Sequence, residues 1–122
     1  MKRMSVAVSL CLAVMSLAAC KGPEEGTSYI AGTYSGVVSA TLPIAVEATV
    51  DALEDLRMTI AHKEVKADQT SAKVIARTDQ NVRVSVEVFP TGDASSTVKI
   101  RVGLSGDQQY SHAIFRNIKG KL

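Results

Sequence analysis

The fold is decided by the stretch AKVIARTDQNVRVSVEVFPTGDASSTVKIRVG, which runs from residue 72 to residue 103. Apolar residues alternate with charged or polar ones in three runs of this stretch, separated by polar segments at 78–80 and 90–96. Successive side chains of a strand point to opposite faces of a sheet, so the alternation predicts three strands that share one apolar face. We therefore expect an antiparallel meander with one side covered.

The register of this meander follows from the rule that directly opposed side chains lie on the same face. A three-residue loop at 78–80 and a longer loop at 90–96 both give continuous apolar pairs. These predicted pairs are Ala76–Val82, Val74–Val84, Ala72–Val86, Val88–Val98, Val86–Ile100 and Val84–Val102. The same register predicts a favourable charge pair between Glu87 and Lys99 on the outer face.

Upstream of the meander, the sequence predicts a strand at 34–40, a helix at 44–56 and a strand at 56–61. Thr41 can cap this helix, because threonine has a side-chain oxygen that accepts hydrogen bonds from the first N–H groups, and a proline is tolerated in the first turn. The acidic residues of the helix lie opposite its apolar side, which is typical of an amphipathic helix with a solvated face. They are Glu47, Asp51, Glu54 and Asp55. The inward phase of the strand at 56–61 predicts that His62 also points inward.

The chain ends in a second amphipathic helix, predicted from Gln108 to about Lys119 and capped by Ser105 or Asp107. The last strand before it has an inward phase that extends to Leu104. The predicted element order is β-α-β-β-β-β-α. We expect a two-layer α+β domain, an antiparallel sheet of about five strands with two helices on one face.

Residues 1–19 have the pattern of an export signal, in which two basic residues precede an uncharged apolar run. As a helix this run is about 21 Å long, short of the roughly 30 Å hydrocarbon core, so a permanent membrane span is disfavoured. The run ends in Leu-Ala-Ala-Cys at 17–20, which resembles the lipobox of bacterial lipoproteins. The alternative is an ordinary secretory signal that is cut near Ala19 and leaves Cys20 as a free thiol.

The lipobox resemblance implies cleavage between Ala19 and Cys20, with a diacylglycerol on the cysteine sulfur and an acyl chain on the new amino group. Cys11 leaves with the signal, so no intramolecular disulfide can form. Lipoproteins that stay in the inner membrane tend to have aspartate directly after the lipidated cysteine. Here that position is Lys21, so the resemblance implies the periplasmic face of the outer membrane. We expect a signal peptide at 1–19, a lipidated flexible tether at 20–32 and one domain at 33–122.

Cleavage of the signal also removes the two basic residues by which the 14 Lys and Arg exceed the 12 Asp and Glu. The side chains of the mature chain therefore carry no net charge. The basic pI of the precursor gives no support to a nucleic-acid partner, which an exported domain would not meet.

The segments ATVDALEDL at 48–56, the meander at 72–103 and GDQQYSHAIFRNIKGKL at 106–122 are together similar to a family of short bacterial lipoproteins. The shared domain of that family has no assigned function. The similarity covers nearly all of the mature domain and rests on residues that build the fold. It therefore implies the topology and no catalytic residue.

The sequence contains no convergent set of catalytic or metal-binding residues. His62 and His112 have no histidine or cysteine at the spacing of a zinc site. The run 103–106 resembles a nucleophile elbow, but Asp107 occupies the position where that motif requires glycine. Glycine-rich phosphate loops are absent. We expect a protein that is not an enzyme and has no cofactor apart from the covalent lipid on Cys20.

The outer face of the meander is the best candidate for a binding surface. The predicted register collects five basic side chains there, with Glu87 as the single acid. They are Lys73, Arg77, Arg83, Lys99 and Arg101. With the acidic helix on the other side, a neutral domain can carry a strong dipole. The alternative is an ordinary solvated face on which lysine and arginine provide solubility.

Two functions are compatible with these features. The first is a non-enzymatic envelope module that binds a periplasmic partner or an anionic envelope polymer through the basic face. The second is a small carrier that holds an apolar ligand between helices and sheet, with Tyr110 or Tyr34 as its polar contact. The carrier requires a well-formed apolar cavity, whereas the binding module requires a filled core.

Overall fold

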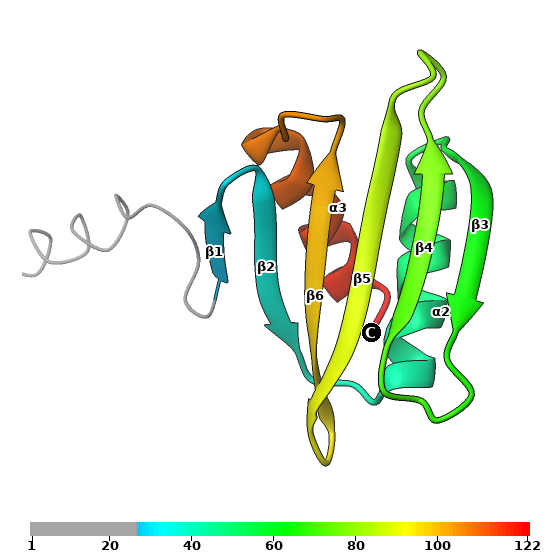
Figure 1. Ribbon diagram of the computed structural model, residues 1–122, viewed down its shortest axis with the longest axis vertical. Helices are drawn as coiled ribbons and strands as arrows, with labels where there is room; N and C mark the ends of the chain where they lie inside the picture. The colour runs from blue at the N-terminus through cyan, green and yellow to red at the C-terminus, as the bar shows by residue number, and fades with distance from the viewer. Residues whose placement is uncertain (1–26) are drawn as a thin grey trace, which may run out of the picture.

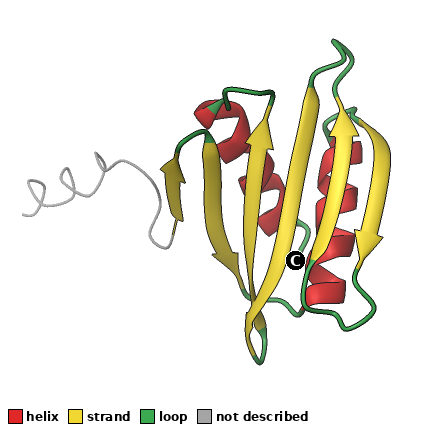
Figure 2. Cartoon of the chain, in the orientation of Figure 1, coloured by secondary structure: helices red, strands yellow, loops and turns green. Residues whose placement is uncertain are grey.

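The computed structural model describes residues 27–122 as two layers, a sheet and two helices that cover one of its faces (Figures 1 and 2). In chain order the elements are β1 (Thr27–Ile30), β2 (Thr33–Val38), α2 (Leu42–Asp55), β3 (Thr59–Val65), β4 (Ala72–Arg77), β5 (Arg83–Gly92), β6 (Ser95–Val102) and α3 (Gln108–Gly120). The predicted α+β architecture is confirmed, with six strands where about five were expected. The predicted signal, lipobox and Cys20 lie outside the described residues.

All strand pairs are antiparallel, and the order across the sheet is β1-β2-β6-β5-β4-β3. The core lies between this sheet and the helices. Val74, Val86 and Ile100 on the central strands are fully buried, as are Leu53 on α2 and Ile114 on α3. Each such side chain stabilises the fold by about 1.5–3 kcal/mol when it leaves water, so the alternation determines which face of the sheet is covered.

The pairing of β5 with β6 has the predicted register, with Val86 opposite Ile100 and Glu87 opposite Lys99. The loop predicted at 90–96 is wrong, because the strands continue through most of it and Gly92 pairs with Ser95. The register shifts between Pro90 and Gly92. A strand accommodates proline at such a bulge, since proline has no N–H to donate to the ladder.

The predicted register of β4 against β5 is wrong by two residues. Val74 lies opposite Val86, where the three-residue loop predicted Val84. Because the error is an even number of residues, every side chain stays on its predicted face. The observed register nevertheless gives each residue a different cross-strand partner, and it places Arg77 directly opposite Arg83.

The cause of the shift is a five-residue loop at 78–82 in place of the expected three. The Thr78 hydroxyl accepts hydrogen bonds from the backbone N–H groups of Gln80 and Val82, at 3.2 and 3.1 Å. Asn81 has a positive φ of 65°, a region that asparagine occupies more readily than most residues. Local side-chain bonds therefore stabilise a longer turn than the apolar pattern indicated.

The sixth strand is β1, in the segment that the sequence analysis placed in the tether. Tyr29 lies opposite Tyr34 on β2, and the turn between the strands consists of Ala31 and Gly32. Both turn residues have positive φ, 52° and 85°, as in the two-residue hairpins that match the twist of a sheet. The fold therefore includes residues 27–32, which shortens the expected flexible segment.

The other edge strand, β3, begins at Thr59 rather than Leu56, because Arg57 turns the chain with a positive φ of 66°. Ala61 is an extra residue, inserted between Ile60 and His62 relative to the facing residues of β4. Such a bulge reverses the facing of the residues that follow it. The His62 side chain is consequently 54% exposed, and the prediction that it points inward is wrong.

α3 begins at its predicted residue, Gln108, and α2 begins at Leu42, directly after Thr41 and two residues before its predicted start. The Asp107 carboxylate accepts a hydrogen bond from the N–H of Tyr110 at 3.0 Å, whereas the Thr41 side chain makes no capping bond. The four acids of α2 are exposed, as expected for the solvated side of an amphipathic helix.

Leu104 follows the end of β6 and does not continue its inward phase. Gly103 has a positive φ of 71°, a conformation that suits glycine and ends the strand. Leu104 is 94% exposed as a result, and the prediction that it faces the core is wrong.

Candidate functional site

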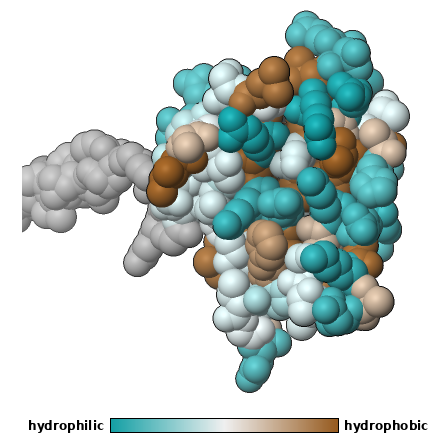
Figure 3. Space-filling view, viewed as in Figure 1, coloured by the Kyte–Doolittle hydropathy of each residue, from teal (hydrophilic) through white to brown (hydrophobic). Residues whose placement is uncertain are grey.

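The outer face of the sheet carries all five basic residues of the predicted binding surface, on the side opposite the helices. Figure 3 shows hydrophilic side chains crossing this face, with apolar atoms exposed between them and along its upper rim. The observed pairing divides the basic residues into two groups, one of lysines around Glu87 and one of arginines at the end of the sheet near the loop 78–82. The two groups differ in what surrounds each charge.

The lysine group is largely engaged with its own sheet. Glu87 lies opposite both Lys73 and Lys99 on the neighbouring strands. The Lys73 ammonium is 4.0 Å from the Glu87 carboxylate, and that of Lys99 lies 5.3 Å from the centre of the Phe89 ring. Exposed pairs of this kind contribute little to stability, but they reduce the charge that these lysines offer to a partner.

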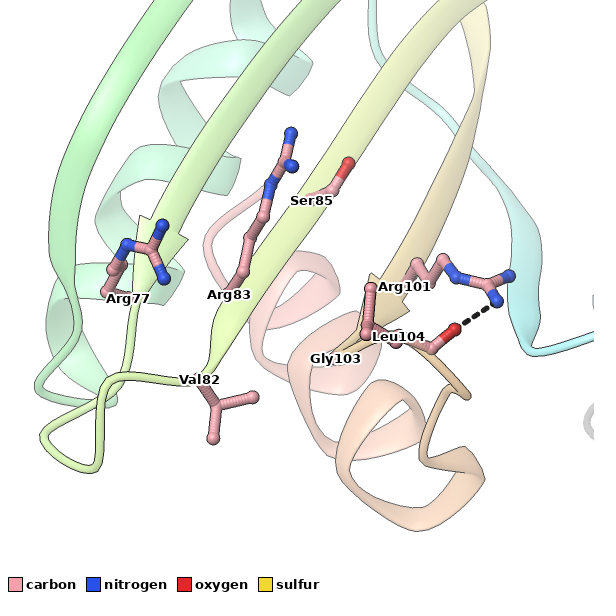
Figure 4. A pocket seen from close by; sticks show the side chains of 7 residues that line it. All are labelled: Arg77, Val82, Arg83, Ser85, Arg101, Gly103 and Leu104. Atoms are coloured by element: carbon pink, nitrogen blue, oxygen red, sulfur yellow. Dashed lines mark hydrogen bonds between the residues drawn. The ribbon is translucent and has the colours of Figure 1, made fainter.

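The arginine group surrounds a hollow of about 610 Å³ at the end of the outer face (Figure 4). Arg77 and Arg83 come from β4 and β5, and Arg101 from the end of β6. The remaining lining residues are uncharged: Val82, Ser85, Gly103 and Leu104. None of the described residues that line this hollow is acidic, so these residues give it a positive electrostatic potential, and its walls combine guanidinium groups with apolar side chains.

Arg101 is used by the fold itself. One of its guanidinium nitrogens donates to the Ala31 carbonyl at 2.8 Å and to the Thr33 hydroxyl at 3.3 Å. The other donates to the Leu104 carbonyl, the bond drawn in Figure 4. Arg101 therefore joins the β1–β2 turn to the segment after β6 and contributes charge to the hollow from a fixed position.

Two glycines allow these turns to approach each other closely. A Cβ atom on Gly32 would lie 2.7 Å from the Ser105 carbonyl oxygen, and one on Gly106 would lie 2.4 Å from the Gly32 oxygen. Contacts this short cannot be accommodated without moving backbone. The packing of the turns explains why the Arg101 guanidinium reaches carbonyl groups on both sides.

Arg77 and Arg83 are the cations that remain available. Arg77 donates one hydrogen bond, to the Asn81 carbonyl at 3.3 Å. Within residues 27–122, the Arg83 side chain has no hydrogen bond or ion pair. The two residues lie directly opposite each other, a position in which like charges are destabilising. An anion placed between them would remove that repulsion.

A second hollow, of about 290 Å³, lies at the same end of the sheet and shares Val82 with the first. Asp79, Asp107 and Tyr110 are among its lining residues. Burial raises the pKa of Tyr110, and the nearby carboxylates of Asp79 and Asp107 raise it further. Asp79 and Asp107 therefore line this second hollow and are not among the described residues that line the arginine hollow.

The histidines occupy separate places in the fold. His62 is 3.6 Å from Glu64 on the exposed edge strand, and the His112 ring packs on Tyr34 at a centroid distance of 5.6 Å. Among residues 27–122, no three side chains of His, Cys, Asp or Glu are grouped to hold a metal ion. In the same range, no helix is long and apolar enough to cross a membrane.

A family model described as protein of unknown function (DUF3568) matches residues 2–121. The chain belongs to this family. The match covers the predicted export signal from Lys2 and the described domain up to Lys121, and it agrees with the expected resemblance to a family without an assigned function. The chain has no match among curated proteins. For this DUF3568 member, a functional interpretation has to rest on the geometry of the site.

Sequence reasoning found the arginines of the hollow but not their arrangement. With the predicted register, Arg77 faced Asn81, so its position opposite Arg83 was missed. The roles of Val82, Ser85 and Leu104 were missed as well, because they depend on how three separate segments meet. A usable signal was the strand-ending Gly103 before a leucine, since a glycine turn there exposes the following residue.

Proposed function

We propose that this protein is a lipid-anchored bacterial envelope lipoprotein that acts as a non-enzymatic binding module for an anionic periplasmic partner or envelope polymer. The observation that carries the proposal is the arginine hollow. Arg77 and Arg83 face each other there, and within residues 27–122 no acid is among the residues that line the hollow. Arginine is well suited to such a role, because its planar guanidinium can bind carboxylate or phosphate with two parallel hydrogen bonds.

The filled core supports binding at the surface over the carrier alternative. Between sheet and helices, Val74, Val84 and Val98 are fully buried, as are the helix residues Ala52 and Ile118 that pack on the same core. A carrier needs a hollow lined by such residues, whereas the hollow with the arginines lies on the opposite side of the sheet.

The lipid on Cys20 is part of this proposal. Two or more acyl chains bind a membrane strongly, and the anchor raises the concentration of the domain near any partner in the same envelope. Lys21 after the lipidated cysteine favours the periplasmic face of the outer membrane as its location.

The test is crosslinking in cells followed by recovery of the full lipoprotein beside two double variants. In the first, Arg77→Gln and Arg83→Gln remove the available cations. In the second, Lys73→Gln and Lys99→Gln remove the same charge from the same face. We expect the parent and the lysine variant to capture one discrete partner and the arginine variant to lose it, with all three showing equal thermal unfolding. Protease treatment of the captured material separates a protein from a polymer.

Two results would contradict the proposal. Retention of the partner by the arginine variant would mean that the hollow is not the binding site. Equal loss in both variants would mean that only the total charge of the face matters, as on an ordinary solvated surface.

A further inference from the structure

We infer that the arginine hollow is a binding site for an amphiphilic oxyanion, a phosphate or carboxylate carried on a short apolar group. The oxyanion lies between Arg77 and Arg83, and the apolar group contacts Val82 and Leu104. This inference rests on the proposed function, since it specifies the ligand chemistry of the same site.

The oxyanion part follows from the donors that the two arginines have left. A guanidinium has five N–H donors. Arg77 uses one of them on the Asn81 carbonyl, and within the described residues Arg83 uses none. Side chains that are directly opposite on neighbouring antiparallel strands start about 4.5–5.5 Å apart at their Cβ atoms, so both forks can reach one tetrahedral or planar anion. The Ser85 hydroxyl lines the same hollow and can donate a further hydrogen bond.

The apolar part follows from Leu104. Leu104 is 94% exposed. On a flexible loop such exposure would need no explanation, but the backbone of Leu104 is held on both sides. Gly103 turns the chain before it, and the Arg101 guanidinium binds its carbonyl. The N–H of Gly103 also donates to the Arg83 carbonyl at 2.8 Å, which ties this turn to the strand that carries the free arginine. The fold therefore holds an apolar side chain beside the cations.

The size of the hollow also favours a ligand larger than a bare ion. Its volume of about 610 Å³ lies within the roughly 300–1,000 Å³ of small-molecule sites. An inorganic phosphate would occupy only the arginine end and leave Val82 and Leu104 in contact with water. An apolar group attached to the anion would remove both side chains from water and add affinity.

The hollow near Glu87 has different chemistry and supports the assignment by contrast. It holds about 210 Å³ and is lined by both acids and bases, among them Glu64, Lys66, Lys73 and Glu87. Mixed charges of this kind neutralise each other and show no preference for an anion. The two hollows on one sheet face therefore provide a built-in comparison.

The test uses the full chain in discs of net-neutral phosphatidylcholine, titrated with inorganic phosphate, butyl phosphate and butanol by calorimetry. We expect butyl phosphate to bind about tenfold more tightly than phosphate, as when about two methylene groups leave water, and butanol not to bind. Leu104→Ser should reduce butyl phosphate to the affinity of phosphate. The double variant Arg77→Gln, Arg83→Gln should bind neither anion, whereas Lys73→Gln, Lys99→Gln should bind both as the parent does.

Equal affinity for phosphate and butyl phosphate, or unchanged binding in the arginine variant, would overturn the inference. Discs that contain phosphatidylglycerol distinguish the two sources of the ligand. If phosphatidylglycerol weakens the binding of butyl phosphate, the ligand is a lipid headgroup. If phosphatidylglycerol does not weaken it, the ligand is a soluble molecule. If partner capture depends on the arginines but the butyl group adds no affinity, the proposed function stands and this inference fails. If butyl phosphate binds as expected but partner capture does not depend on the arginines, this inference stands and the proposed function fails.

Discussion

Arg101 and Arg83 lie on neighbouring strands and face the same side of the sheet, but their guanidinium groups have different surroundings. That of Arg101 binds the carbonyls of Ala31 and Leu104, and that of Arg83 has no partner within residues 27–122. Neither the composition nor the alternation of apolar and polar residues distinguishes Arg101 from Arg83. Their difference arises from the turns that meet at Arg101, so it could not be read from strand periodicity.

Arg101→Gln should lower the free energy of unfolding by about 1–2 kcal/mol, because hydrogen bonds from a charged donor are lost and solvent exposure reduces their worth. Arg83→Gln should change it by less than about 0.5 kcal/mol, as expected for a surface side chain without partners. Urea unfolding of both variants measures the difference. Arg101→Lys keeps the charge but cannot span both carbonyls, and it should resemble Arg101→Gln. Full stability of the lysine variant would mean that Arg101 acts through charge alone.

Helices and strands were predicted well from the sequence wherever a segment has a strong apolar period of its own. β4 has its predicted bounds, and α2 and α3 begin close to their predicted residues. The pairing of β5 with β6 was also predicted in its observed register, with Val86 opposite Ile100 and Val88 opposite Val98. Each of these features is determined by residues close together in the chain.

The elements that were missed depend on residues far apart or on backbone detail. β1 has four residues, and its strand conformation depends on pairing with β2. The bulge at Ala61 and the five-residue loop at 78–82 alter which residues pair across the strands. Neither feature can be read from the amino-acid composition. An apolar pattern of period two cannot detect a shift of two residues, which is why the faces were right and the neighbours wrong.

α3 contacts β2 closely through Phe115 and Gly36. The Phe115 ring packs directly on Gly36, where an added Cβ would lie 2.4 Å from the nearest ring atom. Phe115 is 1% exposed, so its ring is packed within the core. Gly36→Ala should therefore destabilise the domain by about 1–3 kcal/mol, the usual cost of overpacking a core. Thermal unfolding measures this.

The matched control is Gly120→Ala, since a Cβ at Gly120 meets nothing within 4 Å. This change should leave the stability equal or slightly higher, because alanine favours helix over glycine. If both variants unfold at the temperature of the parent, α3 does not depend on the close approach of Phe115 to β2.

Across the whole molecule, one group of acids and one group of arginines lie on opposite layers. The exposed acids of α2 lie on the helix layer, and the arginines lie on the far side of the sheet. This separation was predictable, because it depends only on which residues alternate with the core. The concentration of free positive charge at one end of the sheet was not, because it required the true register and the contacts of Arg101.

The proposed lipid anchor on Cys20 would hold this charged face near a membrane. Between Cys20 and Thr27 the chain can extend about 25 Å at most, so a lipidated Cys20 keeps the domain close to the bilayer. Labelled palmitate should enter the parent and the Cys11→Ser variant but not Cys20→Ser. Cys20→Ser should also leave thermal unfolding unchanged, because the buried core is built from residues 34–118. An ordinary secretory signal predicts a free thiol on Cys20 instead of a lipid. The parent would then take up no palmitate, and its Cys20 would react with a thiol-specific label. That result would refute the anchor, since a thioether-linked cysteine has no thiol to react.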